Sequence, residues 1–241
     1  MRVDELSAAL DVGRKAAVRV MTWNIHGALG RNPRFDLTRV VDLIRRWNPD
    51  IVALQEVDSR RALAGGANPF EYLAGAVGVY GIGAKSLTGA DGDYGQMLIS
   101  RWPLNNQSIR DISFGENEPR RAIRAEIATP LGPLTMVATH LGLSIRERRR
   151  QAAVLKELAA GQTPAVVAGD FNDWFWPGSV RGVLSRVLSG RTRYRTFPSV
   201  FPLLRLDRIY CRPREALVRS YVDRAARTLS DHLPVIADLQ I

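Results

Sequence analysis

Four short apolar runs in this sequence each lead to a side chain that can bind a metal ion or move a proton. VRVMTWN ends at Asn24, DIVALQE ends at Glu56, LTMVATH ends at His140, and AVVAGDFND delivers Asp170 and Asn172. Short apolar runs rich in β-branched residues are typical of strands covered on both faces. Polar residues at the ends of several such strands can meet at one edge of a sheet. The pattern therefore predicts a shared polar site at a common rim.

The segments that must position these residues alternate strand and helix signals. Capping residues and helical spacing predict four helices, which begin after Asp36, after Asn68, after Ser144 and at about Ser179, the last running to Leu188. Further strands are expected at residues 96–100, 121–128, 206–211, 216–222 and 234–239, with residues 121–128 in a hairpin with the His140 strand. The glycine-rich stretch 81–95 is expected to form a loop.

Composition limits the class of protein. A chain of 241 residues with 46% hydrophobic content can bury a sizeable core, and we find no apolar run long enough to span a membrane. Acidic residues near the start and the lack of a long apolar stretch there argue against a secretory signal. A single cysteine, Cys211, excludes an internal disulfide framework and a cysteine-rich zinc cluster. We expect a cytoplasmic monomer.

The charge is strongly basic. Lysine and arginine number 34 against 24 acidic residues, a formal net charge of +10, and almost all of the basic residues are arginine. Arginine binds phosphate through two parallel hydrogen bonds, so the excess suits nucleic acid, anionic lipid or another phosphorylated partner. A general bias toward arginine explains the composition equally well. Charge alone therefore identifies no substrate.

Six short motifs resemble, in order, the signature blocks of the endonuclease/exonuclease/phosphatase superfamily, which has the deoxyribonuclease I-like fold. They are WNIHG at 23–27, LQEV at 54–57, THL at 139–141, GDFN at 169–172, LDRIY at 206–210 and SDHLPV at 230–235. The resemblance implies an α/β four-layer sandwich, in which two mixed β-sheets pack face to face with helices on the outside. It divides the chain into a lead segment, 1–17, and a catalytic domain, 18–241.

The same resemblance implies divalent-metal-dependent hydrolysis of phosphoester bonds, with a phosphodiesterase or nuclease as the first expectation. Mg²⁺, or Mn²⁺ in its place, would bind oxygen ligands, since a hard cation prefers carboxylate and amide oxygens. Glu56 is the best candidate ligand, and the resemblance adds Asn24 and Asp231. A surface acid at a strand end and an asparagine that stabilises a turn are the alternatives for Glu56 and Asn24.

The resemblance also implies the catalytic groups. Asp170 would act as the base toward water, with Asn172 orienting it or donating a hydrogen bond to the phosphate. His232 would contact the phosphate or shuttle a proton, with Asp207 fixing its tautomer, and His140 would be the second imidazole. The alternative for Asp170 and Asn172 is a simple β-turn, and the alternative for each histidine is a core residue. The remaining histidine, His26, is expected to be a structural or loop residue.

Substrate contacts are less defined by the sequence. Arg191, Arg193, Arg195 and Arg205 could form a phosphate-binding arm or a solvated basic loop, and Trp174-Phe175-Trp176 could stack on bases, touch a lipid or sugar, or pack the loop. Tyr94 and Arg101 are weaker candidates. A phosphomonoesterase, a lipid phosphodiesterase, a non-catalytic nucleic-acid-binding module and an unrelated metal protein remain as alternative functions.

Overall fold

The computed structural model describes residues 17–29, 36–60, 67–174 and 180–241. These residues form two six-stranded sheets. The first contains β1 (Val18–Asn24), β2 (Ile51–Asp58), β3 (Tyr80–Gly89), β4 (Gly92–Ser100), β11 (Leu217–Val222) and β12 (Val235–Leu239), in the order β11-β12-β1-β2-β4-β3. The second contains β5 (Leu104–Asp111), β6 (Arg121–Thr129), β7 (Gly132–His140), β8 (Ala165–Asp170), β9 (Gly190–Arg191) and β10 (Asp207–Arg212), in the order β5-β6-β7-β8-β10-β9.

Both sheets are mixed, and they share one arrangement. A parallel pair lies near the middle of each sheet, β1 with β2 in the first and β7 with β8 in the second. The other neighbouring strands run antiparallel. The carboxyl ends of parallel strands lie at the same edge of a sheet, so each sheet brings two strand ends together there.

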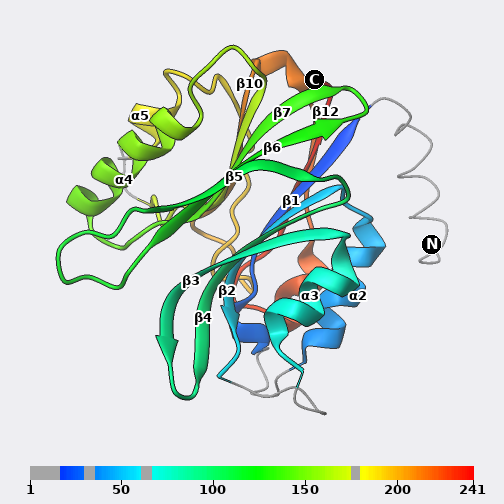
Figure 1. Ribbon diagram of the computed structural model, residues 1–241, viewed down its shortest axis with the longest axis vertical. Coiled ribbons are helices and arrows are strands. Elements are labelled where there is room, and N and C mark those ends of the chain that lie inside the picture. Colours follow the sequence, from blue (N-terminus) through cyan, green and yellow to red (C-terminus); the bar gives the residue numbers. More distant parts are fainter. Residues whose placement is uncertain (1–16, 30–35, 61–66, 175–179) are drawn as a thin grey trace.

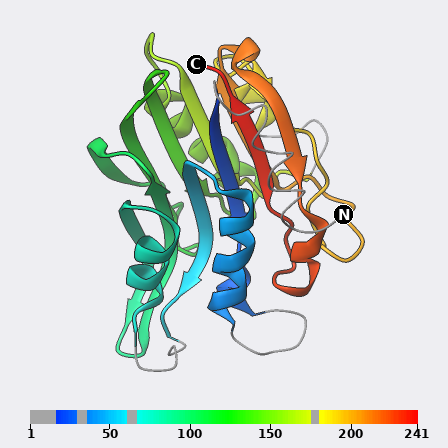
Figure 2. The ribbon, with the colours of Figure 1, turned by 90° about the vertical axis from the view of Figure 1, so that its right-hand side faces the viewer.

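The helices lie on the outer faces of the two sheets (Figure 1). They are α2 (Leu37–Trp47), α3 (Pro69–Val77), α4 (Ile145–Leu158) and the short α5 (Arg181–Leu184), with 3-10 turns η1 (His26–Ala28), η2 (Arg214–Ala216) and η3 (Arg224–Thr228). Helix α2 lies along the outer face of the first sheet (Figure 2), where Val40 and Ile44 join the cluster formed by Trp23 and Leu54. Helix α4 covers the second sheet, where Leu155 packs with Val167 and Tyr210.

Alternation along the strands explains the continuous apolar runs in the sequence. On β1, Val18 and Val20 face the core between the sheets, whereas Met21 and Trp23 face the helices. Residues two apart share a face of a strand, so a strand buried on both faces has apolar side chains at most positions. The inner core contains Ile123, Met136, Val166 and Ile209 from the second sheet together with Ile51 and Leu98 from the first. The α/β four-layer sandwich expected from the sequence is confirmed.

Strand β12 lies between β11 and β1 in the first sheet and pairs with both. The pairing with β1 is antiparallel and runs from Val18 opposite Leu239 to Thr22 opposite Val235. Buried Arg19 reinforces it, since its Nε donates to Asp238 Oδ1 at 2.6 Å and its Nη2 donates to Asp238 Oδ2 at 3.1 Å. Such paired, doubly bonded contacts are the stronger kind of ion pair. The contact joins positions far apart in the sequence.

Most predicted elements are confirmed. Asp36 and Asn68 cap α2 and α3, and Ser144 and Glu147 form the expected capping box on α4. The hairpin of β6 and β7 also forms as expected. Every helix in the described part of the chain is too short or too polar to cross a lipid bilayer.

Two expectations about elements were wrong, and one strand was missed. Residues 81–95 form most of the β3–β4 hairpin rather than a loop. Their glycines serve close approach: a Cβ on Gly83 would lie 2.9 Å from Phe70 Cδ1, and one on Gly95 would overlap the carbonyl oxygen of Ala84. The helix expected up to Leu188 ends at Leu184 and continues as turns. Strand β5 was missed because it is an exposed, polar edge strand without alternation.

Candidate active site

Strand alternation places four of the expected site residues between the two sheets at one end of the sandwich. Asn24 lies two strand positions beyond Thr22 and four beyond Val20, which faces the inner core. By the same two-residue spacing, His140 follows Ala138, Asp170 follows Ala168, and Asp207 precedes Ile209, and all three of these neighbours belong to the inner core. His140 and Asp207 are the register partners of Asp170 on either side of β8. The strand faces that carry apolar side chains in the inner core therefore carry polar side chains at the edge of that core.

Glu56 reaches this rim through a break in the regular strand. Val52 and Leu54 on β2 face α2, so an unbroken strand would turn Glu56 toward that helix as well. Instead, the register with β4 shifts between Gln55 and Val57, and Glu56 has a φ of 57°. A bulge of this kind re-aims a side chain. As a result Glu56 Oε1 accepts a hydrogen bond from Asn24 Nδ2 at 2.7 Å.

Asp170 lies at the centre of the site. Its Oδ2 accepts a hydrogen bond from Asn24 Nδ2 at 3.1 Å, which links the two sheets. The same oxygen lies 3.5 Å from His140 Nε2 and 3.8 Å from His232 Nε2. Its Oδ1 accepts from the backbone N–H of Asn172 at 3.0 Å, and the Asn172 side chain donates to the carbonyl oxygen of Leu141. One buried carboxylate thus faces an amide and two imidazoles.

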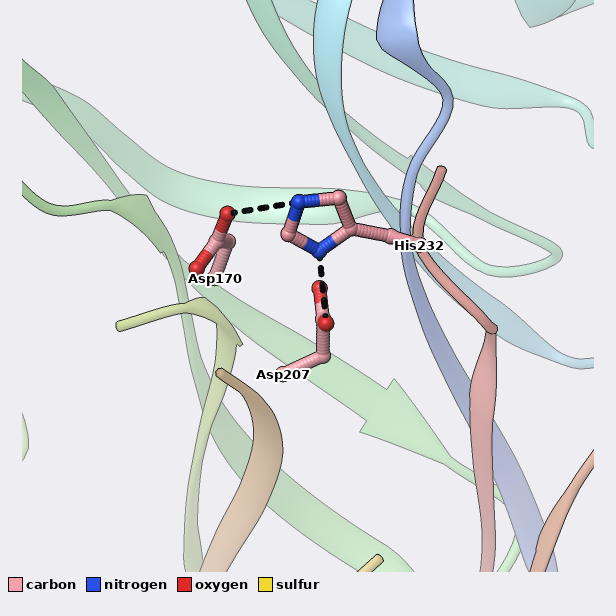
Figure 3. A group of neighbouring side chains, drawn as sticks. All are labelled: Asp170, Asp207 and His232. Atoms are coloured by element: carbon pink, nitrogen blue, oxygen red, sulfur yellow. Dashed lines mark hydrogen bonds and ion pairs between the residues drawn. The ribbon is translucent and has the colours of Figure 1, made fainter. Parts of the chain in front are cut away.

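His232 is held by a carboxylate on the side away from Asp170. Its Nδ1 lies 2.8 Å from Asp207 Oδ2, so His232 bridges the two aspartates (Figure 3). A carboxylate can only accept, so Nδ1 carries a proton. Burial opposes the charged ring, but Asp207 and Asp170 outweigh burial and raise the pKa of His232 to about 10. His232 is therefore an imidazolium at neutral pH.

His140 has the opposite kind of partner. Arg120 Nη1 lies 3.0 Å from His140 Nδ1, and a guanidinium can only donate. Nδ1 therefore accepts, and the proton of the neutral ring is on Nε2, which faces Asp170. Burial, followed by the charge of Arg120, lowers the pKa of His140 to about 4. The two imidazoles thus present Nε2–H groups to the same carboxylate in different charge states.

Glu56 and Asp231 face a common space occupied by His26. Glu56 Oε2 and Asp231 Oδ1 each lie 3.5 Å from His26 Nδ1. Burial raises the pKa of Glu56, but contacts with His26, His140 and Asn24 outweigh it and lower the pKa to about 2. The pKa of His26 is raised, chiefly by its hydrogen bond with Glu56 and further by the charge of Asp231. Glu56 and Asp231 thus stabilise positive charge on the imidazole between them.

The residues around this space fit a divalent cation. Carboxylates such as Glu56 and Asp231 are the ligand type that a hard cation such as Mg²⁺ takes, and the Asn24 amide lies beside Glu56. Asp170, Asp207 and His232 form a second group whose potential ligand atoms lie within 4.8 Å of one another. That group fits less well, because His232 is bonded to Asp207 and positively charged, and a second cation would be repelled there.

The weaker substrate candidates lie differently. Arg101 pairs with Asp50, at the opposite end of β2 from Glu56, so this weaker candidate lies away from the site residues. Tyr94 stacks under the Arg60 guanidinium at 5.2 Å, and Trp174 under that of Arg148 at 4.8 Å. Arg191 donates to Ser185 Oγ, whereas Arg193, Arg195 and Arg205 are exposed. Phe175 and Trp176 lie outside the described residues.

Two residues at the site were not expected there. His26 was assigned a structural role, yet it stands between Glu56 and Asp231. Its position two residues beyond Asn24 was the available signal. Arg120 lies just before β6, outside the strand predicted at residues 121–128, and no sequence pattern connected it with His140, which is 20 positions away.

Comparisons with known proteins agree with this architecture. Residues 21–232 match the model of the endonuclease/exonuclease/phosphatase family. The uncharacterized protein YbhP of Escherichia coli K12 is 33% identical over 253 residues, which cover 96% of this chain and 99% of YbhP. An endonuclease/exonuclease/phosphatase structure from Beutenbergia cavernae matches with a TM-score of 0.75 at 22% identity, over 94% of this chain and 72% of that one. Mannosyl-6-phosphatase Bt3783 of Bacteroides thetaiotaomicron matches with a TM-score of 0.68 at 20% identity, over 93% of this chain and 100% of that one.

Proposed function

Because this chain belongs to the endonuclease/exonuclease/phosphatase family, we propose that it is a divalent-metal-dependent hydrolase of phosphoester bonds, acting first of all on phosphodiesters. Phosphoester hydrolysis is the general activity of the family. The observation that carries the proposal is the position of Asp170, a buried carboxylate that faces the Nε2 atoms of both His140 and His232. We also propose that the protein acts as a cytoplasmic monomer, which gel filtration and cell fractionation would test.

The chemistry of the reaction matches these groups. Water must lose a proton as its oxygen bonds to phosphorus, and the leaving oxygen must be neutralised as its bond to phosphorus breaks. Asp170 is an acceptor for the water proton, and Asn172 orients it through the backbone N–H bond to Oδ1. His232, charged at neutral pH, can give its Nε2 proton to the leaving oxygen or hold a phosphoryl oxygen. Asp207 fixes its ring and stabilises its charge.

His140 complements this role as a neutral donor. Its Nε2–H can bind a phosphoryl oxygen without exchanging protons at neutral pH, because the pKa of the ring is about 4. Preorganised donors in a buried site stabilise growing negative charge more strongly than water does. Mg²⁺ or Mn²⁺ bound by Glu56 and Asp231, with Asn24 beside them, would supply positive charge next to the phosphoryl oxygens.

An activity panel tests this proposal. Purified protein is assayed on DNA, RNA, abasic DNA, phospholipids and phosphomonoesters, each with Mg²⁺, with Mn²⁺ and with a chelator. We expect turnover of at least one phosphodiester that the chelator abolishes. Turnover confined to monoesters would indicate a phosphatase instead. Salt-dependent nucleic-acid binding without turnover of any substrate would favour a non-catalytic binding module, which the net charge of +10 allows.

The Asp170→Asn variant tests the assigned base. Asparagine keeps the size of Asp170 and one acceptor oxygen but cannot accept a proton from water. We expect turnover to fall by about 10²-fold or more, since general acid–base groups contribute about 10² to 10⁴. Circular dichroism and the melting temperature establish that the variant is folded. Near-normal turnover in a folded variant would remove Asp170 from the role of base.

A further inference from the structure

A loop beside the site exposes three large apolar side chains. Residues 197–204 form this loop, which is closed by an antiparallel bridge between Phe197 and Leu204. Within it, Val200 is 49% exposed, Phe201 is 71% exposed and Leu203 is 53% exposed. Isolated exposed apolar residues are common, but three in one short loop form a patch. Such a patch is characteristic of a docking surface.

The 197–204 loop is attached to the segment that carries Asp231 and His232. The Ser199 N–H donates to the carbonyl oxygen of Asp231 at 2.6 Å, and Ser199 Oγ donates to that of Ser230 at 2.7 Å. The rings of Phe197 and His232 lie 4.8 Å apart between centroids. A partner surface that contacts the exposed side chains would therefore lie close to Asp231 and His232.

The charged side chains on the two segments that flank the loop are all arginines. Arg193, Arg195 and Arg205 are exposed on the two chain segments that lead into and out of it. Arg227 is also exposed, and its carbonyl oxygen accepts from Ser199 Oγ at 3.5 Å. The sequence from 189 to 206 contains no aspartate or glutamate. The patch is therefore an apolar tip with basic flanks.

We infer that the 197–204 loop docks the protein on an anionic phospholipid surface and so presents a lipid phosphoester to the site. This inference rests on the proposed function and names the substrate class. Basic flanks suit lipid headgroups and nucleic acid equally. The exposed side chains of the loop favour lipid over nucleic acid. Valine and leucine have no ring on which a base could stack, whereas contact with hydrocarbon stabilises all three side chains.

Vesicle sedimentation tests the docking surface without depending on turnover. The Asp170→Asn protein is mixed, in the presence of a chelator, with vesicles of equal parts phosphatidylcholine and phosphatidylglycerol, and with vesicles of phosphatidylcholine alone. We expect binding to the mixed vesicles. The double change Phe201→Ser with Leu203→Ser should weaken that binding about tenfold or more, since each buried apolar side chain strengthens partition into a bilayer interface.

Matched control variants separate the loop from general surface effects. Val79 and Val218 are 72% and 51% exposed, and they lie at β3 and β11, away from the loop. Changing both to serine should leave vesicle binding unaltered. Changing Arg193 and Arg195 to glutamine should weaken binding by about fivefold per charge. The same change at Arg214 and Arg219, which are exposed outside the loop and its flanking segments, should have a much smaller effect.

The outcomes distinguish this inference from the proposed function. Wild-type protein that hydrolyses a soluble diester but does not bind the mixed vesicles would overturn the docking surface and leave the hydrolase standing. Vesicle binding that depends on Phe201 and Leu203, without turnover of any substrate, would support the docking role of the 197–204 loop and contradict the proposed hydrolase function. A loop variant that loses binding to single-stranded DNA and keeps vesicle binding would overturn the lipid assignment in favour of nucleic acid.

Discussion

Two histidines of this site differ because of the residue behind each ring. Asp207 accepts a hydrogen bond from the Nδ1–H of His232 and stabilises the charge of that ring, whereas Arg120 donates a hydrogen bond to Nδ1 of His140 and opposes a charge there. The same ring thereby becomes a cationic donor on one side of Asp170 and a neutral donor on the other. The identity of each partner therefore sets the protonation state of each imidazole.

Replacing Arg120 by methionine tests this difference. Without the guanidinium, Nδ1 of His140 no longer accepts a hydrogen bond, and the positive charge that disfavours protonation of the ring is gone. We expect the pKa of His140 to rise from about 4 and the fixed Nε2–H tautomer to become a mixture. Nitrogen NMR measures both, and the chain contains only three histidines. Arg120→Lys restores the charge and should return the pKa toward its original value. An unchanged His140 spectrum in Arg120→Met would contradict the assignment.

The sequence predicted individual site residues better than their contacts. Strand-end positions brought Asn24, His140 and Asp170 together, as strand geometry requires. The bulge that turns Glu56 toward the site leaves no mark in an apolar alternation pattern. Arg120 could not be found, because its contact with His140 depends on the β6–β7 pairing rather than on nearby sequence. The assigned roles of all these residues stay predictions until activity is measured.

Individual elements were predictable where a cap or an apolar period marked them. Helix α4 is an example, since Ser144 and Glu147 in the sequence predict the capping box that the structure contains. The β3–β4 hairpin was not predictable in the same way. Glycine is common in turns, and nothing in the composition of residues 81–95 reveals that two strands approach too closely for side chains there. The division at residue 17 also stays a prediction, since residues 1–16 lie outside the described ones.

Glycine substitutions test the close approach in this hairpin. Gly95→Ala would press a methyl group against the carbonyl oxygen of Ala84. We expect it to lower the free energy of unfolding by about 1–3 kcal/mol, the usual cost of overpacking. Gly75→Ala is the matched control, because an added Cβ there meets nothing within 4 Å. This change in α3 should instead stabilise the fold by about 0.5–1 kcal/mol. Denaturant titration measures both, and equal effects would contradict the explanation.

At the scale of the whole molecule, the site lies where the inner core opens at one end of the sandwich. Carboxylates from both sheets converge there, including Glu56, Asp170, Asp207 and Asp231. Their mutual repulsion in the folded state is offset by the imidazoles and arginine around them. A bound divalent cation would offset it further, so binding should be measurable as stability as well as activity.

Thermal unfolding with and without metal tests this coupling. Mg²⁺ at about a hundredfold excess over its dissociation constant should stabilise the fold by about 2.7 kcal/mol. For a chain of this size, that corresponds to a rise in melting temperature of about 5–10 °C over protein in chelator. Glu56→Gln removes one charged ligand and should reduce the rise. A variant whose response equals that of the wild type would exclude Glu56 from the metal site.

The pairing of β1 with β12 governs when the protein can first work in a cell. Arg19 and its partner Asp238 are 219 positions apart, so β12 leaves the ribosome long after β1. Until then β1 has an open edge, and His232 has not yet been added. A chain that stops before His232 and β12 would therefore be an aggregation-prone fragment without a complete candidate site. The order of translation thus makes completion of the first sheet and completion of the candidate site nearly simultaneous.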